Sequence, residues 1–317
     1  MCSALLLTAF ASSTFAEPFP TRDQNPVLSG FGLPIPMPAQ IASADPWQWS
    51  ADFNWGSSAI VQTNARESLL VDAETRELRF NLTRTIDERW AVQLQVPYRY
   101  TGAGNLDGFI DSWHDFFNLP EGVRPELPRD QFRIRYERDG VALIDADESS
   151  EGLADITAAL GYQWMTNERS RVTAWLTLDL PTGDAEKFTG NGSTDISLAL
   201  AGEQRLSTRW TAFAQATVTH VGESDLLEDR QRSVVWSGLA GIGANVWRGL
   251  DLKLQLNAHT AVIDDSALDY LSDALVLTVG GTWKFRSGWQ LDVGVSEDIA
   301  VETSPDVVFV IGVRRAR

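Results

Sequence analysis

WQWSADFNW, residues 47–55, decides the fold of this chain. Its apolar residues occupy the odd positions, and its polar residues Gln48, Ser50, Asp52 and Asn54 occupy the even ones. Successive side chains of a β-strand point to opposite faces, so this period of two indicates a strand with one apolar and one polar face.

The same alternation returns along the rest of the chain. It is clear at residues 78–83, 90–99, 155–164, 172–180, 250–259 and 275–285. Residues 193–204, 209–219, 289–298 and 305–315 are weaker, and residues 232–247 carry apolar side chains on both faces. Together these stretches predict an all-β fold of about twelve antiparallel strands.

Short and long connections alternate between the expected strands. Short turns are expected near 87–89, 166–170, 206–209, 248–249 and 286–288, and longer polar loops near 56–66, 101–152, 181–192, 220–231, 260–272 and 298–304. This arrangement is typical of an outer-membrane β-barrel. A further hairpin is predicted around Asp139-Gly140. We place it inside the longest loop, which keeps the strand count even.

Tryptophan supports the membrane interpretation. Seven of the tryptophans fall near the short-turn ends of the expected strands: Trp47, Trp90, Trp164, Trp210, Trp247, Trp283 and Trp289. Indole prefers a membrane interface, so this distribution predicts an aromatic girdle. The alternative is a soluble β-sandwich or lipocalin-like barrel. That alternative is disfavoured because a barrel with polar side chains inside and apolar ones outside is costly in water.

The N-terminal region divides into two zones ahead of the barrel, which we assign to residues 47–317. Residues 1–16 resemble a signal peptide, with an apolar run at 4–10 and a small-residue cleavage site before Glu17. Residues 17–46 hold many of the prolines and cannot form a central strand. This lead segment is either a periplasmic tail or a plug in the barrel.

Composition narrows the functional classes. The 43 Asp and Glu against 26 Lys and Arg give a formal net charge of −17, which argues against nucleic acid as a partner. The single cysteine, Cys2, lies in the signal-peptide zone, so the mature protein cannot rely on disulfides. We expect the Gram-negative outer membrane as location, with membrane lipid, lipopolysaccharide and the outer-membrane assembly machinery as partners.

Several local motifs point to a family. They are Asn25-Pro26 with the run GFGLP at 30–34, DGFIDSWHDFFNLP at 107–120, PRDQF at 128–132 and LPTGD at 180–184. Together they resemble a family of exported Gram-negative proteins catalogued as a domain of unknown function. The resemblance spans nearly the whole chain after the signal-peptide zone and implies no catalytic residue. The chain also ends in Arg317, whereas many outer-membrane barrels end in an aromatic residue.

The longest loop is predicted to contain a short amphipathic helix. Residues 106–119 space their aromatic and aliphatic side chains on one helical face, and Pro120 would end the helix. Such a helix could fold into the mouth as a constriction, lie at the outer-leaflet interface or cap the apolar rim. Phe109, Trp113 and Phe116 are the constriction candidates.

The polar parity of the strands gives the candidate lumen residues. These are Asp52, Arg79, Gln95, Arg99, Asp155, Asp179, Asp251, Lys253 and His259. Their mixed charge suits either a wet, narrow pore or a closed interior held by hydrogen bonds. The loops near 145–151, 223–229 and 264–273 are acidic, which indicates solvated tips or carboxylates that gather divalent cations.

Three functions remain open from the sequence. The first is a channel or uptake protein for small solutes, and the second is a structural or adhesive barrel acting through its acidic loops. The third is a membrane hydrolase, although no serine is tied by spacing to His114, His220 or His259. We favour the channel, expect no enzymatic activity and predict no cofactor.

Overall fold

The computed structural model describes residues 15–41, 45–117, 123–228, 230–299 and 302–315, with only the backbone described for Trp113, His114 and Phe117. The signal-peptide prediction therefore falls mainly outside the described residues. Among the described residues, no helix is long and apolar enough to span a membrane.

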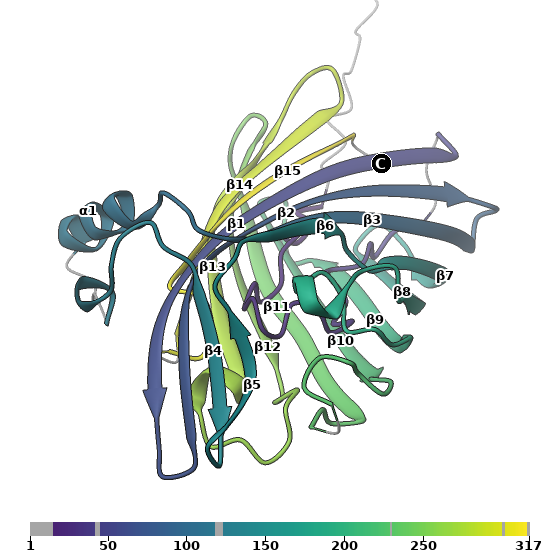
Figure 1. The fold of residues 1–317 in the computed structure, drawn as a ribbon. Coiled ribbons are helices and arrows are strands. Elements are labelled where there is room, and N and C mark those ends of the chain that lie inside the picture. The colour runs from purple at the N-terminus through teal and green to yellow at the C-terminus, as the bar shows by residue number, and fades with distance from the viewer. Residues whose placement is uncertain (1–14, 42–44, 118–122, 229, 300–301, 316–317) are drawn as a thin grey trace, which may run out of the picture.

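Twelve antiparallel strands close into a barrel (Figure 1). Closure is made by β1 and β15, whose pairing runs from Ser50 opposite Arg314 to Ser57 opposite Val307. In ring order the strands are β1 (Trp47–Thr63), β2 (Glu67–Thr85), β3 (Trp90–Gly102), β7 (Ile156–Thr166), β8 (Ser170–Leu180), β9 (Asp195–Arg205), β10 (Trp210–His220), β11 (Val234–Trp247), β12 (Leu250–His259), β13 (Ala274–Lys284), β14 (Trp289–Asp298) and β15 (Val307–Arg315). The predicted fold class is confirmed.

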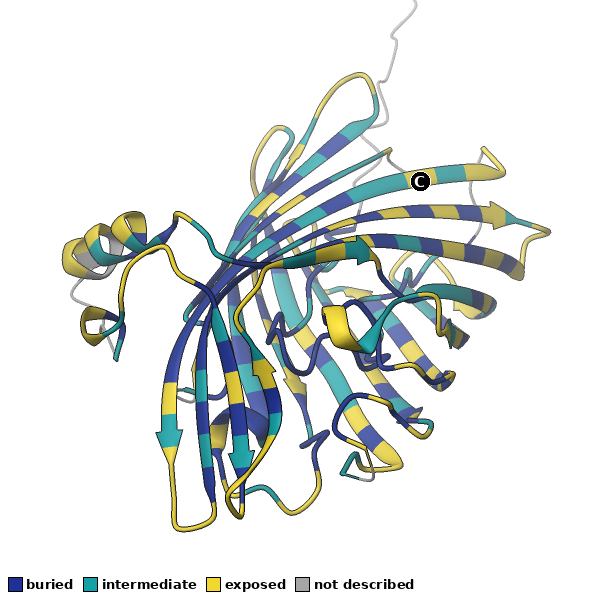
Figure 2. Ribbon diagram, viewed as in Figure 1, coloured by how far each residue is buried: buried dark blue, intermediate teal, exposed yellow. Residues whose placement is uncertain are grey.

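The alternation along each strand separates an apolar exterior from a polar interior. On β2, Leu78 and Phe80 are about half exposed, whereas Arg79 between them is buried. Figure 2 shows the same banding of buried and exposed residues along the strands. Apolar side chains face outward, where a bilayer favours them, and polar side chains are enclosed.

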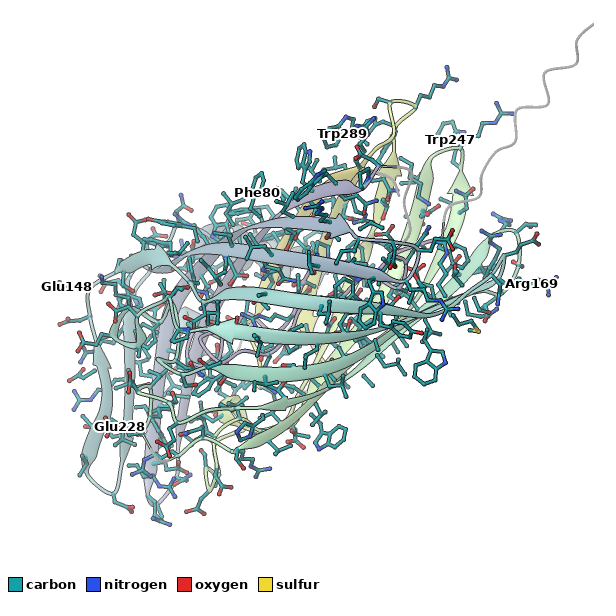
Figure 3. The ribbon with its side chains drawn as sticks, turned by 90° about the vertical axis from the view of Figure 1, so that its right-hand side faces the viewer. Phe80, Glu148, Arg169, Glu228, Trp247 and Trp289 are labelled. Carbon is teal, nitrogen blue, oxygen red and sulfur yellow. The ribbon has the colours of Figure 1, made fainter. Side chains whose placement is uncertain are left out.

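The two ends of the barrel differ in composition. Figure 3 shows Trp247, Trp289 and Arg169 toward the short-turn end, and Glu148 and Glu228 at the opposite end among the long loops. The side chains of Trp164 and Trp247 are each 73% exposed, as expected for an interfacial girdle. We call the long-loop end the outer end.

Three further strands extend the wall at the outer end. The predicted hairpin forms β4 (Arg133–Arg138) and β5 (Val141–Ala146), and β4 pairs with the outer part of β2. The short β6 (Ser150–Leu153), which was not predicted, pairs with β3. The prediction of a long loop near 56–66 was wrong, because β1 and β2 continue to Thr63 and Glu67 to meet this hairpin.

One helix and three 3-10 turns complete the described chain. They are α1 (Asp107–Phe117), η1 (Arg124–Glu126), η2 (Ala185–Lys187) and η3 (Asp269–Leu271). The predicted helix is therefore present. Near it, Arg124 forms ion pairs with Asp107 and Asp306 and fixes the loop against the wall.

An apolar cluster lies at the outer end of the barrel. It joins Ile60 and Leu69 of the β1–β2 hairpin, Ile134 and Tyr136 of β4, and loop residues including Leu227, Val262 and Tyr270. Val27, Leu28 and Phe31 of the lead segment belong to the same cluster. The outer loops and the lead segment thus share one core, which is called the outer cap below.

An occupied lumen as the candidate transport site

Residues 17–41 of the lead segment lie inside the barrel, together with Phe15 and Ala16 before them (Figure 1, purple). The chain enters at the short-turn end, where Ala16 lies against Gly243 near the start of the β11–β12 turn. It reaches the outer end, where Asn25 Nδ2 donates to the Tyr270 carbonyl, and returns to the short-turn end at Ile41. We call residues 15–24 the ascending limb, 25–31 the turn and 32–41 the descending limb.

The ascending limb follows β12 in a constant register. Contacts join Glu17 to Lys253, Phe19 to Gln255, Thr21 to Asn257 and Asp23 to His259, and every pair is 236 residues apart. A constant offset requires the limb to have the same rise per residue as a β-strand. The limb is therefore an extended chain whose alternate residues meet the inward side chains of β12.

Ionic contacts hold both ends of the ascending limb. Lys253 Nζ donates to the Glu17 carbonyl at 3.0 Å and lies 3.8 Å from the centre of the Phe19 ring. The same ammonium pairs with Asp292 at 2.7 Å. At the other end, His259 Nε2 lies 3.0 Å from an Asp23 carboxylate oxygen. Buried charges require such partners, so these contacts fix the limb in place.

The turn begins with an asparagine that caps its own backbone. The Asn25 side-chain oxygen accepts hydrogen bonds from the N–H groups of Val27 and Leu28. This Asx-type turn reverses the chain and directs Val27, Leu28 and Phe31 into the outer cap.

Glutamines hold the descending limb by its main chain. Gln215 of β10 accepts from the Met37 N–H at 2.6 Å and donates to the Ile35 carbonyl at 3.2 Å. Gln163 of β7 repeats this two-point contact with Ile41 and Ala39 at 2.8 and 3.0 Å. A glutamine amide carries the same donor and acceptor as a peptide group, so each side chain acts like a short piece of a neighbouring strand.

The prolines of the descending limb reduce the number of hydrogen-bond acceptors that the wall must supply. Pro34, Pro36 and Pro38 have no N–H, so the limb mainly needs donors for its carbonyls. The wall supplies them: Trp175 Nε1 donates to the Pro38 carbonyl and Thr173 Oγ1 to the Ala39 carbonyl, both at 2.8 Å. The wall thereby replaces part of the hydrogen bonding that bulk water would give to this segment.

Glycine on the inner wall makes room for the ascending limb. A Cβ built on Gly312 of β15 would lie 2.9 Å from Pro20 Cγ. That separation is too short for a normal contact. The segment therefore packs so closely on the wall at Gly312 that one added methyl group would require a shift.

A pocket between the limbs and the wall contains both signs of charge. Arg79 of β2 and Arg99 of β3 line one side and share Glu77, and Asp155 and Asp179 line the other. The Arg79 Nη1 atom is buried with no hydrogen-bond partner among the described residues. Burial raises the pKa of Asp155, and the N–H groups of Gly183 and Asn191, which donate to its carboxylate, oppose that rise.

The structure places each of the nine lumen candidates on the inner side of the barrel. Asp52 accepts from Asn81 Nδ2, Gln95 contacts the Met37 sulfur, and Asp179 accepts from Thr157. Asp251 accepts from Asn245 and pairs with Lys284, beyond the pairs already given for Arg79, Arg99, Lys253 and His259. The candidates divide into contacts with the segment and contacts within the wall.

Sequence reasoning missed the residues that hold the descending limb. Gln163, Gln215 and Trp175 all face inward, and Trp175 is fully buried. Trp175 stands between Thr173 and Thr177 on the polar face of β8, and this single large aromatic residue was the available signal. Nothing in the local sequence pattern indicates that these three side chains contact residues 35–41.

The constriction prediction is not met by Phe109. Its ring lies 5.6 Å from the ring of Phe309, which faces outward on β15, while neighbouring Val308 and Val310 pack on Phe19 inside. Leu106 and Ile110 also pack against outward side chains of the wall, including Trp55 and Val295. The helix therefore lies outside, because its apolar face is buried on the barrel exterior.

Of the other two constriction candidates, Phe116 has a described side chain. Phe116 is 80% exposed at the end of α1. The side chain of Trp113 lies outside the described residues. Figure 1 shows α1 beside the barrel wall and away from its interior.

Two of the three histidines have described side chains. His220 Nδ1 contacts the Ser233 carbonyl, and His259 contacts Asp23 in the lumen. Among the described residues, no group of three or more His, Cys, Asp or Glu side chains could hold a metal ion. The side chain of His114 lies outside the described residues.

The closed ring, the polar inner wall and the apolar exterior define an antiparallel twelve-stranded β-barrel of the transmembrane type. The chain belongs to the family described as "Protein of unknown function (DUF3187)", whose model matches residues 1–316. A search of curated proteins gives no match.

Solved structures support the fold alone. The COG4313 outer-membrane channel from Pseudomonas putida F1 is 15% identical, with a TM-score of 0.60 over 88% of this chain and 98% of that one. The NanC porin is 7% identical, with a TM-score of 0.48 over 85% and 100% of the two chains. The toluene transporter TbuX from Ralstonia pickettii is 9% identical, with a TM-score of 0.44 over 86% and 90%.

Proposed function

We propose that this protein is an outer-membrane uptake channel for small polar solutes, and that residues 17–41 are its displaceable plug. The observation that carries this proposal is the way in which the segment is held. Its contacts with the wall are hydrogen bonds, ion pairs and packing, mostly to inward polar side chains. None of these contacts belongs to the ladder of backbone hydrogen bonds between the strands, so the segment can leave without unfolding the barrel.

The strand ring supports the same view. All twelve ring strands pair with one another without using the segment as a member of the sheet. Removing the plug would therefore leave the ladder of backbone hydrogen bonds intact. The exposed inner wall would then present Gln, Asn, Thr and charged side chains to water.

Conductance in planar bilayers tests the proposal. The intact protein should conduct weakly, and a variant lacking residues 17–41 should open a stable pore. Heat-modifiable migration and circular dichroism would verify that the deleted variant is still a folded barrel. A folded variant with no conductance would contradict the proposal.

A closed structural or adhesive barrel is the second candidate, and the outer cap favours it. The cap places fully buried apolar residues such as Val262, Tyr270 and Leu271 over the outer end. On this account the acidic loops bind a surface partner, lipopolysaccharide bridged by divalent cations being the simplest. It predicts surface binding that is lost on loop deletion, with no conductance in either protein.

A further inference from the structure

The inner wall recognises the main chain of the lumen segment. Wall side chains donate to the carbonyls of Glu17, Phe19, Pro20, Thr21, Ile35, Pro38, Ala39 and Ile41. Wall side chains also accept from the N–H groups of Phe19, Gly32, Met37 and Ile41. The inner wall therefore carries hydrogen-bond donors and acceptors that match the main chain of an extended polypeptide.

We propose that the solutes of this channel are short peptides, which bind the wall in place of the lumen segment. This inference rests on the proposed uptake function. The central element is a set of three two-point contacts, in which Gln163, Gln215 and Gln255 each accept one N–H of the segment and donate to one of its carbonyls. Such pairs read a backbone amide and ignore the side chain attached to it.

The wall beside these glutamines leaves room for varied side chains. Met37, Ala39 and Ile41 pack against Trp175 and against small inward residues, namely Ala91, Ala159, Ala199 and Ala201. Alanine gives a shallow surface on which alternate side chains of an extended peptide can rest. The side chains of this cluster are all uncharged, which favours small or apolar residues of a bound peptide at these positions.

The charged pocket suits the ends of a short peptide. Arg79 and Arg99 lie on one side and Asp155 and Asp179 on the other, around a cavity of about 30 Å³ while the segment is present. The unpartnered Arg79 Nη1 atom is a buried cationic donor that an incoming carboxylate would satisfy. The aspartates are the corresponding acceptors for a terminal ammonium group.

Trialanine and trisarcosine provide a matched test. The two are isomers of equal mass and charge, but trisarcosine has no amide N–H. Each would be added to the channel lacking residues 17–41, and the block of its current in planar bilayers would be measured. Trialanine should bind about tenfold more tightly, because two main-chain hydrogen bonds are lost in its isomer.

Substitutions on the inner wall test whether Gln163 and Gln215 cause the difference in binding between the two peptides. Gln163→Met and Gln215→Met preserve side-chain size, and together they should reduce trialanine binding to the level of trisarcosine. Thr219→Val, on the inner wall beyond the descending limb, serves as the control and should change the binding of neither peptide. Equal block by the two isomers in an open channel would overturn the peptide inference and leave the channel standing. A folded deletion variant without current would overturn both.

Discussion

The two limbs of the lumen segment occupy one interior but are held by different chemistry. The ascending limb is fixed by charge at both ends, through Lys253 and Arg314 near Glu17 and through His259 at Asp23. The descending limb contains no charged residue from Gly32 to Ile41, and from Ile35 onward it is held by neutral amides, threonines and a tryptophan. The comparison teaches that the ascending limb depends mainly on charged wall groups and that most of the descending limb depends on neutral ones.

Release of each limb can be followed with a single introduced cysteine. In a Cys2→Ser background, Thr21→Cys reports on the ascending limb and Ala39→Cys on the descending limb, and both native side chains are buried. The rate of maleimide labelling in the folded barrel measures how often each limb is exposed. The predictions below use these two substitutions, called the ascending reporter and the descending reporter.

Lys253→Met should have the largest effect. The ammonium contacts Glu17, Phe19 and Asp292, and its side chain is fully buried. Its removal should cost about 3 kcal/mol and raise labelling of the ascending reporter on the order of a hundredfold. Labelling of the descending reporter should rise much less. Equal increases for the two reporters would show that the limbs leave together.

Gly312→Leu should have the next largest effect. The new side chain would collide with Pro20 and removes no hydrogen bond of the wall. Overpacking of this kind costs about 2 kcal/mol, which corresponds to about a thirtyfold rise in labelling of the ascending reporter. Gly202→Ala, on a strand remote from the ascending limb, is the control. An unchanged rate in Gly312→Leu would place the limb elsewhere.

Gln215→Met should loosen the descending limb by a smaller amount. It removes one acceptor for Met37 and one donor for Ile35 while keeping the side-chain volume. About 1 kcal/mol should be lost, giving about a fivefold rise in labelling of the descending reporter and little change in the ascending one. A larger rise for the ascending reporter would contradict the separate anchoring of the limbs.

Ile110→Ala should leave both limbs unchanged. Ile110 is buried on the outer face of the barrel beside Leu106 and Val307. The cavity should destabilise the attachment of α1 by about 3 kcal/mol, visible as faster proteolysis within residues 103–126. Faster labelling of either reporter would show that the helix and the lumen segment are coupled.

The sequence was sufficient for the barrel because its signal is local. Alternation at residues such as Leu78, Arg79 and Phe80 assigns faces without knowledge of any partner, and the tryptophans mark one rim. The same reasoning placed all nine charged or polar candidates on the inner wall. It could not reveal the register between residues 17–23 and β12, because that contact spans 236 residues.

The helix shows the opposite case. Its amphipathic spacing predicted α1 correctly, but spacing alone does not tell which apolar surface receives the helix. Phe109 and Ile110 could pack on either of two apolar surfaces, the barrel mouth or the barrel exterior. The mouth is covered by the outer cap, whereas Phe309 and Trp55 offer an apolar exterior at the same level.

A disulfide between the limb and β12 tests the central claim most directly. In a Cys2→Ser background, Thr21→Cys and Asn257→Cys place thiols at two residues that are joined by a hydrogen bond of 3.2 Å from the Asn257 side chain to the Thr21 carbonyl. Mild oxidation of intact outer membranes should cross-link this pair, and the pair Thr21→Cys with Gln163→Cys, on the far side of the barrel, should not react. Failure of the first pair to cross-link, with the thiol at position 21 freely labelled in a folded barrel, would show that the segment lies outside the lumen and would contradict the account.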